Sequence, residues 1–166
     1  MRGVMQLETD TEGWPQGEWD ALAARAASAT AQIAPELANP RLVASLLFTD
    51  DDRIHELNHE WRARDKPTNV LSFPMLSRAQ LLALGDVGPP EMLGDVALAH
   101  GTCAREAAEK GIILEAHAAH LLVHGLLHLA GHDHEISTAD AAAMEALEIK
   151  ALAIMGIADP YEASNV

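Results

Sequence analysis

The spacing of apolar and polar residues along the chain divides it into short strands and longer helices. Runs that are apolar, or that alternate with polar residues, predict strands at residues 4–7, 41–49, 69–73 and 94–99. Apolar positions spaced for one helical face predict helices at 17–34, from the aspartates at 50–52 to Trp61, and at 100–110, 114–130 and 137–155. The stretch 76–93 is rich in glycine and proline, and we expect it to form a mobile loop.

The order of these elements predicts an α+β fold. The strands gather in the first part of the chain and the helices in the last, which is typical of a small mixed β-sheet packed by helices. A chain of 166 residues is long enough for one full hydrophobic core. We therefore expect a single domain over residues 1–166, in which the helix at 114–130, with the most apolar run, is buried against the sheet.

Three histidines near the end of this helix have the spacing of metal ligands. His124 and His128 lie four residues apart, so on a helix their imidazoles project from one face and can share one ion. Gly131 can adopt a left-handed conformation, end the helix and return the chain, which brings in His134 as a third ligand. Three neutral imidazoles with an open fourth position suit a catalytic divalent metal, and zinc fits this set best.

Two further histidines share the helical stripe of His124. His117 and His120 precede it by seven and four residues, but no nearby turn returns a third ligand to a site made from His120 and His124. We expect His120 to support the ligands from behind or to line the cleft, and His117 to do the same or to stand on a partly exposed helix. Asp133, in the turn, is expected to orient a ligand imidazole or a bound water, although a plain turn aspartate fits equally well.

The residue that follows the first ligand separates this pattern from a common class of metallopeptidases. A His-Glu-x-x-His helix carries a glutamate there as general base, whereas this chain has Gly125. A hydrolase built on these histidines must find its proton acceptor elsewhere, or rely on metal-bound water, whose pKa the metal lowers to about 7.

Net charge restricts where a nucleic acid can bind. The formal charge is −14, which opposes broad attraction to phosphates, so any such site must be local. One basic cluster exists at Arg62, Arg64 and Lys66. Much of the acidity lies elsewhere, in residues 8–20 and in the last helix with Asp140, Glu145 and Glu148. The resulting dipolar surface is compatible with an anionic substrate.

Composition also predicts the compartment. Cys103 is the single cysteine, which excludes an internal disulfide, and a small buried hydrophobic residue is its commoner role. The sequence shows neither an apolar signal core nor a membrane span. We expect a cytoplasmic protein without a membrane partner.

Several short motifs follow one another in a characteristic order. They are Leu57-Asn58, Arg62, the run from Asp65 to Pro74, Leu93-Gly94-Asp95-Val96, Glu115-Ala116-His117 and the run from His124 to His134. Together, from about Leu42 to Tyr161, they resemble the YbeY family of bacterial metal-dependent endoribonucleases. One departure is His132, where the family usually has tyrosine, and a histidine there can act as an extra ligand or a proton shuttle.

The resemblance implies cleavage of single-stranded RNA, maturation of ribosomal RNA, especially at the 3′ end of the small-subunit RNA, and quality control of ribosomes. It implies ribosomal RNA and the small ribosomal subunit as partners, and one metal, usually zinc, held by His124, His128 and His134. The family's functionally important arginine falls at Arg62, whose planar guanidinium can hold a phosphate and stabilise charge during cleavage. We therefore expect Arg62 and His124 to take part in catalysis, and Arg62, Arg64 and Lys66 to bind RNA.

Other interpretations of the same residues remain open. Arg62 can instead form a surface ion pair with Glu60 or Asp65. The side chains of three polar residues can either form hydrogen bonds with RNA or fix the start of a strand. These residues are Thr68, Asn69 and Ser72. The histidines also suit a metallohydrolase of another substrate, or a ribosome-assembly binding protein with a structural metal.

Overall fold

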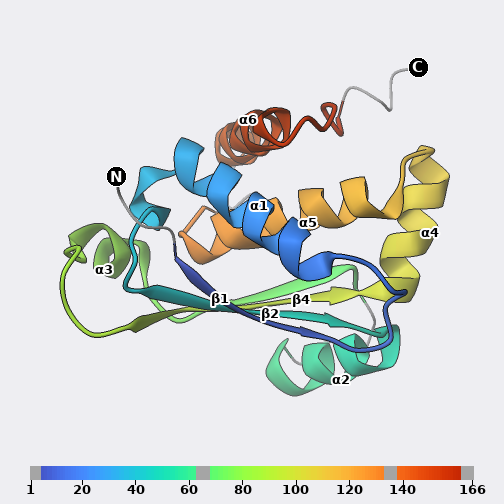
Figure 1. The fold of residues 1–166 in the computed structure, drawn as a ribbon, viewed down its shortest axis with the longest axis horizontal. Helices are drawn as coiled ribbons and strands as arrows, with labels where there is room; N and C mark the ends of the chain where they lie inside the picture. The colour runs from blue at the N-terminus through green and yellow to red at the C-terminus, as the bar shows by residue number, and fades with distance from the viewer. Residues whose placement is uncertain (1–4, 63–67, 133–137, 162–166) are drawn as a thin grey trace.

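The centre of the fold is a mixed β-sheet. The computed structural model describes residues 5–62, 68–132 and 138–161 (Figure 1). The sheet order is β1 (Gln6–Thr11), β2 (Leu42–Thr49), β4 (Glu91–Ala99) and β3 (Val70–Pro74). The first three of these strands run parallel, and β3 is antiparallel to β4. The predicted α+β class with a small mixed sheet is confirmed.

Helices cover the two faces of the sheet unequally (Figure 1). One face carries α1 (Trp19–Ile33) and α5 (Leu114–Leu129), and α6 (Thr138–Ile154) packs against both from outside. The other face carries α2 (Asp51–Arg62). Helix α4 (His100–Lys110) stands at the end of the sheet, and two short elements, η1 (Pro35–Leu37) and α3 (Arg78–Ala83), complete the chain.

Helix α5 is the most enclosed of the helices, as predicted. It contacts β3, β4, α1, α4 and α6, and its apolar side chains, such as Leu122 and Leu126, are fully buried in the main core. Gly125 makes the closest approach to the sheet, since a Cβ atom there would lie 2.7 Å from Val96 Cγ1. A smaller core of Ile54, Leu71, Ala97 and Ala99 lies under α2.

Helix α4 ends at Lys110, as predicted from the sequence, and Gly111 begins the corner to α5. This glycine has φ of 70°, in the left-handed region, and its backbone N–H caps the end of α4. The two helices are bent by 114° relative to each other. Within the described part of the chain, only this bent pair has the combined length and apolar composition of a membrane span, and no single helix does.

Two predicted elements differ from the structure. The first strand continues past the predicted end at residue 7, because its pairing with β2 extends from Gln6, opposite Val43, to Thr11, opposite Phe48. The loop predicted at 76–93 contains α3 and the first residues of β4. Ser77 and Gln80 form a capping box, with bonds of 2.8 and 3.1 Å, and Leu81 is buried, which together outweigh the nearby glycines and prolines.

Candidate metal centre

Gly131, which follows α5, has the predicted left-handed conformation. Gly131 has φ of 97°, and the backbone N–H of His132 donates to the Leu127 carbonyl at 3.1 Å. Arg78, from α3, donates to the Ala130 carbonyl at 2.7 Å and so satisfies the exposed end of the helix. A Cβ atom at Gly131 would lie 2.7 Å from Arg78 Cβ, so both the backbone angle and the close packing require glycine.

His124 is held by a buried carboxylate on α6. Its Nδ1 lies 2.6 Å from Glu148 Oε2, and Glu148 is 1% exposed. The other carboxylate oxygen accepts hydrogen bonds from His120 Nε2, at 2.9 Å, and from the Tyr161 hydroxyl. His120 and His124 thus contact the two oxygens of the same buried carboxylate.

Glu148 is ionised in this environment. Burial opposes its ionisation, but the hydrogen bonds from His120, His124 and Tyr161 outweigh it and lower the pKa of Glu148 to about 2. An ionised carboxylate only accepts, so the Nδ1 of His124 carries the hydrogen. In a neutral His124 the lone pair is therefore on Nε2.

His128 is held by the sheet. Its Nδ1 forms a short hydrogen bond with the Ser72 hydroxyl, and Ser72 is a buried residue of β3. This contact orients a side chain of the site, a role that the sequence did not predict for Ser72.

One contact network includes both His117 and Asn69. His117 is 1% exposed, so the expectation of a partly exposed helix was wrong, because α4 covers this part of α5. Its Nε2 lies 2.8 Å from Glu106 Oε1, which also accepts from Asn69 Nδ2 at 2.9 Å. Asn69 therefore fixes the start of β3.

His132, where the resemblance suggested an extra ligand or proton shuttle, lies beside another carboxylate. Its Nε2 is 3.7 Å from Glu36 Oε2, and Glu36 also pairs with Arg78 at 3.0 Å. Burial, together with the charge of Arg78, lowers the pKa of His132. This places a mostly neutral imidazole next to the turn.

The donor set fits a divalent transition metal. His124 and His128 stand one helical turn apart, and each uses Nδ1 to contact a neighbouring oxygen, the arrangement usual for imidazoles that bind a metal through Nε2. No three His, Cys, Asp or Glu side chains within 5–62, 68–132 and 138–161 form a group that could hold a metal. His134, the expected third ligand, and its neighbour Asp133 lie outside the described residues.

The predicted RNA-binding residues are also largely outside the described part. Arg62 is the last residue of α2, and its side chain is not among those described. Arg64 and Lys66 follow it outside the described ranges.

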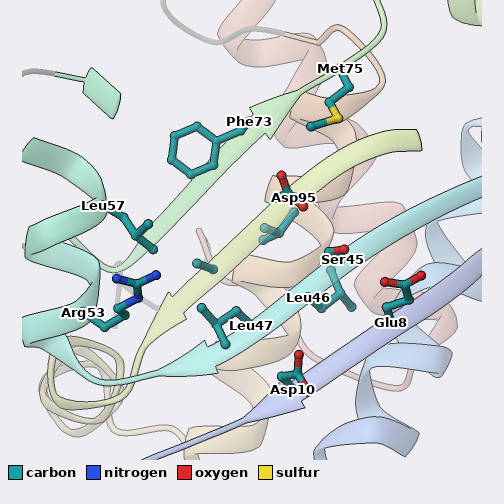
Figure 2. Close-up of a pocket in the computed structure, with 12 residues that line it drawn as sticks. Glu8, Asp10, Ser45, Leu46, Leu47, Arg53, Leu57, Phe73, Met75 and Asp95 are labelled. Atoms are coloured by element: carbon teal, nitrogen blue, oxygen red, sulfur yellow. The ribbon is translucent and has the colours of Figure 1, made fainter. Parts of the chain in front are cut away.

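A groove on the opposite face of the sheet has a different character (Figure 2). It has a volume of about 460 Å³ and lies beside α2, over β1 to β4. Its acidic side chains are Glu8, Asp10 and Asp95, and the one cation in its lining, Arg53, is paired with Glu56 at 3.2 Å. These carboxylates disfavour phosphate, so the groove does not suit an RNA backbone.

Sequence reasoning missed Glu148, which it treated as part of the acidic surface. A signal was present, because the buried residues of α6 are Met144, Glu148, Ala151 and Leu152, and these share one helical face. A carboxylate on the apolar stripe of a helix needs a buried partner. The pattern does not say which partner.

The chain is similar to known proteins over nearly its whole length. The family model described as Endoribonuclease YbeY matches residues 6–156. A relative of that name from Erythrobacter litoralis is 66% identical over 157 residues, covering 95% of this chain and 98% of the relative. Another, from Novosphingobium aromaticivorans, is 58% identical over 159 residues, covering 95% of each chain.

One solved structure supports the fold. The solution structure of TM1509 from Thermotoga maritima matches with a TM-score of 0.59 and 22% identity, covering 98% of this chain and 93% of that one. The arrangement of strands and helices is therefore shared with an experimentally determined protein.

Proposed function

This chain belongs to the endoribonuclease YbeY family, and on that premise we propose that it is a zinc-dependent endoribonuclease acting on single-stranded RNA. The proposed role is maturation of ribosomal RNA in the cytoplasm, at the 3′ end of the small-subunit RNA, together with quality control of ribosomes. The small ribosomal subunit is the proposed partner.

The observation that carries the metal proposal is the support behind the two histidines. His124 and His128 face the same way on α5, and Glu148 and Ser72 restrain their Nδ1 atoms. Partners of this kind fix the orientation of an imidazole and increase its basicity. Packing α5 for stability alone does not require that a buried glutamate and a buried serine contact histidines on two successive turns of this helix.

The proposed roles divide between holding the metal and holding the substrate. His124, His128 and His134 would hold one zinc ion, which when bound supplies a Lewis acid at the scissile phosphate. Glu148 keeps His124 in one tautomer and Ser72 keeps His128 in place. Arg62 would hold the phosphate with its planar guanidinium, and Arg64 and Lys66 would bind neighbouring phosphates.

The lack of a glutamate beside His124 supports a nuclease over a peptidase. Gly125 lies against Val96 in the sheet, so this position has no room for the carboxylate side chain of a metallopeptidase base. The structure thus gives a packing reason for the departure from the peptidase motif.

Cleavage of defined RNAs tests the proposal. Single-stranded and duplex RNA are incubated with metal-replete protein, metal-free protein and the His124→Ala variant, with His55→Ala on α2 as a matched histidine control. We expect cleavage of the single strand by the replete protein and by the control, and loss of cleavage in the other two. If replete protein cuts no RNA but binds ribosomal subunits, the assembly-factor alternative replaces the nuclease.

A further inference from the structure

Besides their direct packing, β3 and α5 are connected by polar contacts at two separate points. At one, the Ser72 hydroxyl meets His128. At the other, Asn69, just before β3, binds Glu106 of α4, which binds His117 of α5. Asn69 and Ser72 are three residues apart in the sequence. Their partners on α5, His117 and His128, are eleven residues apart.

Strand β3 is short and lies at the edge of the sheet, so contacts outside the sheet help to fix its position. It has only five residues and pairs with a single neighbour, β4, in the described sheet. Asn69 fixes the N-terminal end of the strand through three hydrogen bonds. Its carbonyl accepts from the Ala99 N–H at 2.9 Å and from the Cys103 thiol at 3.7 Å. Its side-chain amide donates to Glu106 at 2.9 Å. Only the last of these continues to α5.

Burial of the His117 imidazole lowers the stability of the fold, so stability alone does not explain a histidine at this position. It is 1% exposed, and its Nδ1 is buried without a hydrogen-bond partner among the described residues. An apolar side chain at this position would avoid that cost. The Nε2 contact with Glu106, at 2.8 Å, is what the imidazole adds here.

We propose that Glu106 and His117 are positioning residues that set β3 on α5, so that Ser72 meets His128. This inference rests on the proposed zinc site. Loss of the Asn69–Glu106–His117 contact should let β3 shift along α5 and weaken the Ser72–His128 hydrogen bond. The effect on the metal would then pass entirely through Ser72.

Zinc affinity measured by competition with a chelator tests this dependence. Supports behind a ligand usually change metal affinity by about 10- to 100-fold, so we expect Ser72→Ala to fall in that range and Glu106→Ala to lower affinity by about 10-fold. Glu106→Gln, which keeps an acceptor for both partners, should stay within about twofold of wild type. Glu109→Ala, at an exposed position of the same helix, is the matched control and should change nothing.

The double variant Ser72→Ala/Glu106→Ala separates positioning from general stability. If Glu106 acts through Ser72, adding Glu106→Ala to Ser72→Ala leaves the zinc affinity unchanged. Additive losses, or wild-type affinity in a folded Glu106→Ala protein, overturn the proposal. If circular dichroism shows that Glu106→Ala does not fold, Asn69→Ala replaces it in the same comparison of single and double variants. Asn69 is at a partly exposed position.

A measurement without metal distinguishes this proposal from the zinc site itself. The ¹⁵N chemical shift of His128 Nδ1 reports the hydrogen bond with Ser72 in metal-free protein. We expect this chemical shift to change in Glu106→Ala and to equal the wild-type value in Glu106→Gln and Glu109→Ala. A wild-type chemical shift in Glu106→Ala rejects the positioning role. Failure of wild-type protein to bind zinc, with the shift still moving, rejects only the zinc site.

Discussion

A single side chain, Glu148, joins three elements at the histidine site. It lies on α6, receives His120 and His124 from α5, and receives the hydroxyl of Tyr161 from the segment after α6. Its charge is buried and is offset by hydrogen bonds from all three partners. Removing a partner from such a network leaves a buried polar group unsatisfied, which costs about 1–3 kcal/mol or more.

Glu148→Gln should weaken the proposed zinc site while leaving the fold in place. Glutamine has nearly the same size but carries no charge, so it restrains the His124 tautomer less firmly. We expect zinc affinity to fall by about 10- to 100-fold, measured by competition with a chelator. Glu145→Gln, on the same helix and partly exposed, is the control, and equal affinities in the two variants would contradict the role of Glu148.

At the scale of elements, the sequence was informative where the contacts are local. The i, i+4 spacing of His124 and His128, the stop at Gly111 and the left-handed Gly131 all follow from helix geometry, and the structure confirms them. The sequence pattern does not reveal α3, because the glycines and prolines after it dominate the local pattern and obscure the Ser77–Gln80 capping box. The partners of the histidines lie on β3, α4 and α6, and spacing along one helix contains no information about them.

The contact of α5 with the sheet depends on the small size of Gly125. Alanine favours a helix over glycine by about 1 kcal/mol, but here its Cβ would lie 2.7 Å from Val96 Cγ1, in a buried β-branched side chain that has little freedom to move. Overpacking of this kind typically costs about 1–3 kcal/mol.

We therefore expect Gly125→Ala to destabilise the protein in chemical unfolding experiments. Val96→Ala removes the clashing methyl group, so the double variant should be more stable than the sum of the two single changes predicts, by about 1 kcal/mol. A strictly additive result would show that the helix relaxes away from the sheet without cost.

At the scale of the whole molecule, the Glu106–His117 pair makes stability depend on pH. Burial lowers the pKa of His117 below 6.5. Burial opposes ionisation of Glu106, but hydrogen bonds from His117 and Asn69 lower its pKa below 4.5. In both cases the unfolded chain binds protons more readily than the folded one, so acid favours unfolding.

Stability should therefore decline as the pH falls below about 6.5, and decline further below about 4.5. Glu106→Gln should reduce the second decline, because glutamine does not titrate, and Glu109→Gln should leave it unchanged. Unfolding free energies of metal-free protein from pH 8 to about pH 3 measure this, because the Glu106 contribution is lost below its ordinary pKa of 4.5. An identical pH profile for Glu106→Gln and wild type would mean that Glu106 is not ionised preferentially in the folded state.

The charge of the whole chain limits how RNA can bind. The formal charge is −14 and the groove beside α2 is acidic, so the phosphate contacts that we propose are those of Arg62, Arg64 and Lys66. Each phosphate neutralised on a single strand contributes about −0.7 to the slope of log affinity against log salt, so three contacts give a slope of about −2.

Arg64→Glu should make this slope shallower by about 0.7 and weaken binding, because one phosphate contact is lost and a repulsive charge is added. Arg105→Glu, at an exposed position on α4, makes the same change in net charge away from the cluster. Affinity for a fluorescent single-stranded RNA, measured from 50 to 300 mM salt, compares the two. If both variants shift the slope equally, RNA responds to the net charge of the molecule and the local basic cluster is not its binding site.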